Sequence, residues 1–441
     1  MGYNSLLRKI ILIIGDIICL HLATSISMAL ELGNKQTDKI AFHLEFLPIL
    51  VIMMFFMFNV YGLFSLIRKK LVDIFLNLLV AVTNVYIVAM AMTFFFRQFD
   101  YSRVVLVYSA VFSFVLLAIW QYICHQWEWK HFPKQTAVLF AAGEEAARIQ
   151  NKLAKTYGLE HALQSVCDSC QQANWKQLID ANYYVFIGAE LPIADKEKIL
   201  RYARSMKKQI FFVPTLYELA CKNTGFLLVD DIPMQRVTRM LLTAEQRILK
   251  RTLDCVVSVV AIILLSPIML LTAVFIKLDS KGPVLYSQER MGLYGKTFFV
   301  HKFRSMKQDA EAKCGPVLAA EGDPRITKFG RLMRATRLDE LPQLFNVLKG
   351  EMSIVGPRPE RPFFVKQFIS QKPEYDYRHN VKPGITGLAQ IAGKYNTSAY
   401  DKLIYDLLYI QDVSVKTDLM IMLQTFKVLL TKSSTEGVQG K

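Results

Sequence analysis

Four long apolar stretches, separated by short polar and basic segments, dominate the first 130 residues of the chain. They lie near residues 10–30, 47–65, 74–96 and 104–124. Each has about the 20 apolar residues that a helix needs to cross a bilayer. Basic residues precede the first stretch, separate the second from the third and follow the fourth. Because cytoplasmic loops carry the excess of Lys and Arg, residues 1–130 are predicted to form four transmembrane helices, with the chain after residue 125 on the cytoplasmic side.

One carboxyl group interrupts the first apolar stretch. Asp16 is costly in hydrocarbon, and such a residue is a candidate functional site by default. No further ionisable residue in the apolar stretches aligns with it, which disfavours a transporter. A carboxyl group that is paired inside the bundle or lies near the membrane interface is the preferred interpretation.

The pattern changes in residues 131–240 to short β-rich runs separated by helical ones. The runs QTAVLFAAG, NYYVFIGA and KQIFFVP alternate with amphipathic segments, which predicts a small parallel α/β, Rossmann-like domain. Its first turn, FAAGEEA, offers only Gly143 of a G-x-G-x-x-G loop and carries two acids where a pyrophosphate would lie. A degenerate structural or regulatory module is expected, and nucleotide binding is the disfavoured alternative.

A third region, residues 241–432, opens with an uncharged run of 22 residues, 255–276. As a helix this run would reach about 33 Å, enough to span. Basic residues flank it on both sides, however, so both ends suit the cytoplasmic face. In its middle, Pro267 removes a backbone donor and Ser266 can bond the released carbonyl. We therefore predict a re-entrant helix that turns back at Ser266 and Pro267. The tail, residues 433–441, is expected to be disordered.

Charge and cysteine content narrow the function classes. The chain has 441 residues, 53% of them hydrophobic, and a net charge of +16; from residue 247 onward 29 Lys and Arg face 18 Asp and Glu. An anionic partner is therefore expected mainly in the C-terminal half: a phosphate-bearing substrate, a membrane surface or nucleic acid. Seven cysteines fit no disulfide framework, and Cys167 and Cys170 have the CxxC spacing without a second pair, so an incidental reduced pair is preferred over a metal or redox role.

The segment RITKFGRLMRATRLDELPQL concentrates basic residues and then sets Asp339 beside Glu340. Taken alone, Asp339 is interpreted as the N-cap of a helix with Pro342 in its first turn and Gly350 at its end. A second interpretation is a phosphate site. A carboxylate that attacks a diphosphate meets a repulsion of about 4 kcal/mol per pair of unit charges at about 4 Å. Such an attack needs cations, either arginines or Mg²⁺ held by a carboxylate.

Long, ordered motifs in residues 247–432 resemble the catalytic domain of the bacterial sugar transferases, the monotopic polyprenyl-phosphate phosphoglycosyl transferases. They are Lys250-Arg251 with Asp254, Ser266-Pro267, KFRSM, DPRIT, LDELPQLFNVLKGEMSIVGPRPE and VKPGITGLAQI. Glu351 stands where Asp is common in that family. The first 240 residues match by architecture only. The resemblance is to the large members that start exopolysaccharide, capsule or O-antigen assembly.

This resemblance implies a membrane protein with an N-terminal four-helix transmembrane bundle, a central α/β Rossmann-like domain and a C-terminal α/β-irregular monotopic catalytic domain. It implies that Asp339 attacks a UDP-sugar, releases UMP and passes the sugar phosphate to undecaprenyl phosphate. Glu340 would hold Mg²⁺, and the Pro357-Arg358-Pro359 motif would contact the nucleotide through Arg358. Phosphates would be held by Lys302, Arg304, Arg325 and Arg334. The site would lie on the cytoplasmic face of the bacterial cytoplasmic membrane, against the lipid bilayer.

The alternative from another class is a non-catalytic membrane scaffold or regulator of polysaccharide assembly, which would release no UMP. A nucleic-acid partner is not expected, because it explains the positive charge but not the acid pair. The sequence leaves open which sugar is used (glucose, galactose or an N-acetylated sugar) and the oligomeric state, a homo-oligomer included.

Overall fold

A computed structural model of the chain describes residues 3–32, 37–64, 69–95, 103–131, 136–156, 162–170, 174–220, 225–229, 232–236, 241–307, 323, 325–393 and 398–430. The chain divides into two compact units, Met1–Thr215 and Leu216–Lys441. The expected disordered tail, residues 433–441, lies outside the described residues.

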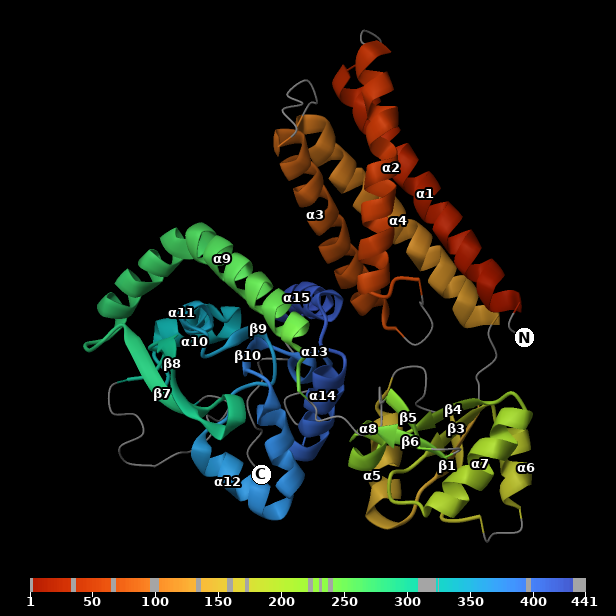
Figure 1. Ribbon diagram of the computed structural model, residues 1–441. Helices are drawn as coiled ribbons and strands as arrows, with labels where there is room; N and C mark the ends of the chain where they lie inside the picture. The colour runs from red at the N-terminus through yellow and green to blue at the C-terminus, as the bar shows by residue number, and fades with distance from the viewer. Residues whose placement is uncertain are drawn as a thin grey trace. The chain divides into compact units, whose positions relative to one another are not determined.

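Four helices form the N-terminal part of the first unit: α1 (Tyr3–Leu32), α2 (Thr37–Val60), α3 (Leu71–Phe95) and α4 (Arg103–His131). They run side by side in Figure 1. Within the described residues, α1, α3 and α4 are long and apolar enough to cross a membrane, and α2 contributes the shorter apolar helix Leu47–Val60. The four predicted apolar helices are therefore confirmed, and they support membrane association of the chain.

Buried polar contacts join α1 to α4. The Asp16 carboxylate accepts a hydrogen bond from the Gln121 amide (Nε2 to Oδ1, 3.1 Å). Nearer the N-terminus, Arg8 lies 3.2 Å from Glu128. The interpretation of Asp16 as a paired carboxyl group inside the bundle is confirmed.

The rest of the first unit is a four-stranded parallel sheet in the order β2-β1-β3-β4. Its strands are β1 (Ala137–Phe140), β2 (Leu163–Cys167), β3 (Tyr184–Ile187) and β4 (Gln209–Phe212). Helix α5 (Gly143–Ala154) covers one face, and α6 (Trp175–Ala181) and α7 (Ile193–Ser205) cover the other (Figure 1). Val138 and Phe140 pack toward α6 and α7, while Leu139 packs toward α5. The predicted parallel α/β domain is confirmed. The thiols of Cys167 and Cys170 donate to the backbone carbonyls of Ser169 and Asp195, respectively.

The second unit combines two-stranded sheets with many helices. Its strands are β5 (Gly225–Val229) with β6 (Ile232–Arg236), β7 (Leu285–Met291) with β8 (Thr297–Phe303), and β9 (Ser353–Val355) with β10 (Gly384–Thr386). Its helices are α8 (Leu216–Ala220), α9 (Ala244–Asp279), α10 (Lys328–Thr336), α11 (Gln343–Lys349), α12 (Pro362–Gln371), α13 (Leu388–Ala392), α14 (Ala399–Gln411) and α15 (Val415–Leu430). One apolar core includes Leu219 of α8, Val347 of α11, Val355 of β9 and Leu407 of α14. A second cluster packs Met333 of α10 against Ile276 and Phe303. This arrangement fits the expected α/β-irregular domain.

Helix α9 holds the long uncharged run and is also long and apolar enough to cross a membrane. It is one continuous helix of 36 residues with Pro267 inside, and it bends near its middle (Figure 1). The Ser266 hydroxyl donates to the Ile263 carbonyl at 2.9 Å, which is the carbonyl that Pro267 leaves without an amide donor. The predicted contact of Ser266 is therefore confirmed. Re-entry into one leaflet stays a prediction, because the helix is bent and not broken.

Both ends of α9 contact the same unit. The first turns bond to the last turn of α11 through Arg251 and to β9 through Asp254. The last turn is held by Arg304, whose guanidinium donates to the carbonyls of Ser280 and Lys281 at 2.7 and 2.9 Å. A straight helix of this length would be about 54 Å long. The bend returns its C-terminal end to the domain from which it starts.

Candidate active site

The acid pair lies in a tight turn between two helices. Helix α10 ends at Arg337, which adopts the left-handed conformation (φ 59°). A single 3₁₀ turn, Leu338–Glu340, follows, and α11 begins after Pro342 and ends at Gly350 (φ 87°). The Asp339 side chain caps neither helix, so its interpretation as an N-cap is wrong. Gly350 ends the helix as predicted. The turn thus presents both carboxylates without using them to cap a helix.

Three cations meet at one oxygen of Glu340. Oε1 accepts from Arg358 at 2.7 Å and from Lys302 at 3.1 Å, and Arg337 lies 3.6 Å away. Burial opposes ionisation of Glu340, but these three cations hold its pKa well below the ordinary value of 4.5. The Glu340 charge in turn raises the pKa of Arg358. Glu340 is therefore an anion whose charge is already compensated by the protein.

Asp339 has a different environment. Its side chain is buried, with 8% of the residue exposed, and Oδ1 has no hydrogen-bond partner among the described residues. Burial and the charge of Glu340 raise its pKa, while Lys302, Arg334 and Arg337 oppose that rise. A carboxylate with one oxygen unbonded, close to several cations, is suited to attack a phosphorus atom.

The structure brings some of the predicted phosphate ligands together and directs others elsewhere. Lys302 and Arg358 contact Glu340 directly. The charge of Arg334 acts to lower the pKa of Asp339, and its Nε donates to the Ser305 hydroxyl at 3.0 Å. Arg325 pairs with Asp323, whose pKa its hydrogen bonds lower to about 2. Arg304 holds the end of α9. The phosphate roles of these residues stay predictions.

Two residues near Glu340 were not among the predicted site residues. Arg337 adds a third cation to it, and Asn346 fixes the strand that carries Lys302. The Asn346 amide donates to the Phe299 carbonyl at 2.7 Å, and its oxygen accepts from the His301 amide at 3.1 Å. Arg337 could have been found in the basic run, since it directly precedes LDE. No local pattern marks Asn346.

The Pro357-Arg358-Pro359 motif is fixed at each of its three carbonyls. They accept from the Gly384 amide at 2.9 Å, from Arg378 at 2.9 Å and from Arg290 at 3.1 Å, respectively. A Cβ on Gly384 would lie 2.1 Å from the amide nitrogen of Gly356. The backbones of VGPRPE and VKPGITG are therefore in direct contact, so the two motifs form one structural element.

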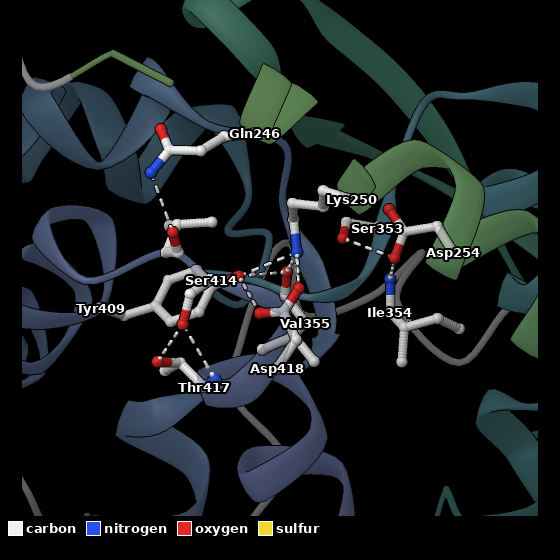
Figure 2. A network of polar contacts seen from close by, with 11 residues as sticks. Gln246, Lys250, Asp254, Ser353, Ile354, Val355, Tyr409, Ser414, Thr417 and Asp418 are labelled. Carbon is white, nitrogen blue, oxygen red and sulfur yellow. Dashed lines mark hydrogen bonds and ion pairs between the residues drawn. The ribbon is translucent and has the colours of Figure 1, made fainter. Parts of the chain in front are cut away.

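The Lys250, Arg251 and Asp254 motif anchors α9 to that element. Figure 2 shows Lys250 at the centre of a buried network, where its Nζ donates to the Val355 carbonyl at 2.9 Å and to Asp418 at 2.7 Å. The Asp254 carboxylate accepts from the Ser353 hydroxyl and the Ile354 amide, both at 2.9 Å. Since β9 runs directly into Pro357, the base of α9 is tied to the segment that carries Arg358.

The acid pair also fits a divalent cation that keeps ligands from outside the protein. Within the described residues, no group of three or more His, Cys, Asp or Glu could hold a metal ion. Mg²⁺ commonly takes one or two carboxylates and completes its shell with water and substrate phosphates. The unbonded oxygen of Asp339 beside Glu340 suits that mode. Glu340 would hold such an ion only together with substrate phosphate.

The first turn of the α/β domain is filled by its own acid. The Glu145 carboxylate accepts from the amides of Ala189 at 2.7 Å and Glu190 at 3.0 Å, which follow β3. These amides lie at the carboxyl ends of β1 and β3, where doubly wound sheets bind ligands. Glu145 thus occupies amides that a ligand phosphate would need.

Comparison with known sequences places the acid pair in a matched segment. The family described as bacterial sugar transferase matches residues 245–432, and the family described as CoA-binding domain matches residues 58–209. The chain is 44% identical over 211 residues to the UDP-N-acetylgalactosamine-undecaprenyl-phosphate N-acetylgalactosaminephosphotransferase of Aeromonas hydrophila, which covers 47% of this chain and 50% of that protein. It is 36% identical over 291 residues to the UDP-glucose:undecaprenyl-phosphate glucose-1-phosphate transferase of Klebsiella pneumoniae, covering 65% and 62%.

A shorter relative is covered almost completely. The chain is 40% identical over 196 residues to the exopolysaccharide production protein PSS of Rhizobium leguminosarum bv. phaseoli, covering 42% of this chain and 96% of that protein. By contrast, the chain spans about half to three fifths of the length of the two longer relatives.

Proposed function

The chain belongs to the bacterial sugar transferase family, and from this premise we propose that it transfers a sugar 1-phosphate from a UDP-sugar to undecaprenyl phosphate. The names of the relatives from Aeromonas and Klebsiella give this acceptor with different sugars. The product would be an undecaprenyl-diphosphate-sugar, the first membrane intermediate of an exopolysaccharide, capsule or O-antigen.

The observation that carries the proposal is the contrast between the two acids. Glu340 has three cations at Oε1, whereas Asp339 keeps Oδ1 without a hydrogen bond among the described residues. A carboxylate already committed to ion pairs is a poor nucleophile, and an unbonded one beside cations is a good one. Asp339 is therefore assigned the attack and Glu340 the supporting role.

In the first half of the reaction, an oxygen of Asp339 forms a bond to the β-phosphorus of the UDP-sugar. The bond between that phosphorus and the bridging oxygen breaks, and UMP leaves with the electron pair. The sugar phosphate stays on Asp339 as an acyl phosphate. Lys302, Arg337 and Arg358 lie where they would stabilise the charge that develops on the phosphate oxygens.

In the second half, a phosphate oxygen of undecaprenyl phosphate attacks the same phosphorus. The bond to Asp339 breaks and the carboxylate is regenerated. Mg²⁺ held by Glu340 would reduce the negative charge of the diphosphate when bound. Helix α9, re-entrant from the cytoplasmic face, would keep the site at the membrane surface, where the lipid phosphate lies.

The test is UMP release from membranes that contain the full-length protein, with undecaprenyl phosphate and a panel of UDP-glucose, UDP-galactose and the UDP-N-acetylhexosamines. At least one donor should release UMP and yield a protein adduct with the mass of one sugar phosphate. Asp339→Asn should insert normally and form no adduct. Failure of every donor to release UMP would favour a non-catalytic scaffold, and turnover by Asp339→Asn would overturn the covalent route.

A further inference from the structure

A buried arginine outside the acid pair contacts the backbone of Arg358. Arg378 is 5% exposed, and its Nη2 donates to the Arg358 carbonyl at 2.9 Å. The same nitrogen lies 2.9 Å from the Asp406 carboxylate, while Nη1 donates to the Tyr375 hydroxyl at 2.5 Å. One guanidinium therefore joins the Pro-Arg-Pro motif to α14 and to the segment after α12.

The side chain of Arg358 leads from that anchored backbone to the acid pair. Its guanidinium donates to Glu340 at 2.7 Å. A long side chain reaches a fixed point only when its own backbone is held, and here the carbonyl at the root of the side chain receives the bond from Arg378. The contacts thus run in one line from Asp406 through Arg378 and Arg358 to Glu340.

Stability alone is a poor account of this arrangement. A buried ion pair loses the hydration of both groups, and a well-packed apolar pair of similar volume often stabilises a core as well or better. Arg378 and Asp406, 5% and 2% exposed, lie beside the apolar core residues Tyr375 and Leu407. What an apolar pair could not supply is the donor to the Arg358 carbonyl.

We propose that Arg378, held by Asp406, is a positioning residue that sets the backbone of Arg358 and so places its guanidinium against Glu340 and the donor substrate. The inference rests on the proposed function. Arg378 touches neither acid of the pair in the structure, and it acts through Arg358.

A double-mutant cycle tests this chain of contacts. Arg378→Lys keeps the charge opposite Asp406 but loses the planar fork that serves several acceptors at once. Adduct formation on Asp339 is measured in the full-length protein in nanodiscs, as a function of UDP-sugar concentration. Arg378→Lys should slow adduct formation about tenfold or more. In an Arg358→Ala background, the same change should have less than about twofold further effect, because residues in one chain of contacts are not additive.

Arg251→Lys is the matched control. Arg251 is another partly buried arginine that donates to two backbone carbonyls, those of Val347 and Leu348, at 2.6 and 2.7 Å. Both carbonyls lie in α11, and neither hydrogen bond reaches the Pro-Arg-Pro motif. Its effect on the rate should therefore be the same factor with and without Arg358, and this separates positioning from a general loss of packing.

Two further outcomes decide the inference. If Arg378→Lys slows adduct formation by the same factor in the wild-type protein and in Arg358→Ala, the positioning role of Arg378 is wrong, while the proposed function stands. If Arg378→Lys does not fold, the paired variant Arg378→Met with Asp406→Leu replaces it, and a wild-type rate of adduct formation in that variant would overturn the inference. If the wild-type protein forms no adduct and releases no UMP with any donor, the proposed function fails and the inference fails with it.

Discussion

The guanidinium of Arg358 donates a 2.7 Å hydrogen bond to Oε1 of Glu340 and so connects the segment after β9 to the turn before α11. Lys302 from β8 reaches the same oxygen. The three motifs that carry these residues lie far apart in the chain, and their ion pairs bring them to one point. Within the described residues Glu340 forms ion pairs with Lys302, Arg337 and Arg358 and Asp339 forms none, which is why the two neighbouring acids differ in chemistry.

The pH dependence of adduct formation should report Asp339. Burial and the charge of Glu340 raise its pKa above the ordinary 3.8, and attack requires the ionised carboxylate. The rate should therefore fall on acidification, and the fall should begin at a higher pH than for an unperturbed aspartate. Single-turnover adduct formation between pH 4 and 8 measures this. A rate that stays constant down to pH 4 would contradict the assignment of Asp339 as a buried nucleophile.

Removal of the Glu340 charge should affect both metal dependence and stability. Glu340→Gln leaves Arg358, Lys302 and Arg337 without their counter-charge. We expect the free energy of unfolding to fall by roughly 1–3 kcal/mol. This range is kept small because the side chains of Arg337 and Arg358 are more than a third exposed, where solvent screens the charges. The native pKa of Glu340 is depressed, so its contribution to stability is present above pH 4.5 and is lost as the pH falls toward the native pKa. The drop in Tm between pH 7 and pH 3 should therefore be smaller for Glu340→Gln than for the wild-type protein.

Chelation is the companion measurement for Glu340. Wild-type activity should disappear with a chelator and return with Mg²⁺ or Mn²⁺. Glu340→Gln should be slow at every metal concentration. Full wild-type activity in chelator would remove the metal from the scheme, whatever the variant does.

Much of this site could be read from the sequence, because its motifs are long and keep their order. The positions of Asp339, Glu340, Lys302 and Arg358 followed from them. The capping interpretation failed because D-E-L-P before an apolar run has the same local pattern in a cap and in a 3₁₀ turn. The left-handed Arg337, which the pattern does not reveal, decides between them. Arg378 escaped notice because it lies in the polar stretch PEYDYRHN, where a charged residue is indistinguishable from a solvated one until packing buries it. Asp406 is a lone acid in the apolar run LIYDLLYI, and this signal could have marked it as buried.

The same limits apply to the fold. The strands β1, β3 and β4 lie in apolar, β-rich runs and were predicted, whereas β2 was not. Its sequence LQSVC has the polar residues Gln164 and Ser165 between its apolar ones, so it carries no continuous apolar run. Ser266 and Pro267 correctly indicated an irregularity in the middle of α9. They did not reveal that the helix continues through the proline as one bent helix.

Gly384 should not tolerate a side chain. A Cβ there would lie 2.1 Å from the Gly356 nitrogen and 2.5 Å from the Thr386 carbonyl oxygen, and both are backbone atoms that cannot swing aside. Gly384→Ala should cost about 1–3 kcal/mol and slow adduct formation by displacing Pro357. Gly295→Ala is the control: it has open space around the new methyl group and only the left-handed backbone cost, about 1–2 kcal/mol. Equal adduct rates for the two variants would show that the contact of the two motifs is not needed.

The second unit should work without the first. It begins at Leu216, and Leu219 is buried in the core that also contains Val355. A protein starting at residue 216 should keep part of the adduct formation in detergent, and one starting at residue 241 should be less stable, because it lacks Leu219. Thermal unfolding and adduct mass measure both. If only the full-length chain forms adduct, residues 1–215 contribute to the site.

The topology of α9 is the last expectation, and single-cysteine labelling measures it. If the helix re-enters one leaflet, both of its ends lie on the cytoplasmic face. Probes belong at Arg247 and Lys281, which are exposed, and not at Lys250, which is buried in the network of Figure 2. In a background without the native cysteines, both probes should react only from the cytoplasmic side.

Pro267→Leu restores the amide that the Ile263 carbonyl lacks and should straighten the helix. In that variant adduct formation should fall, because the C-terminal end of α9 can no longer reach Arg304. If the probe at residue 281 reacts from outside the cell while Pro267 is unchanged, α9 crosses the whole membrane and the re-entrant topology is wrong.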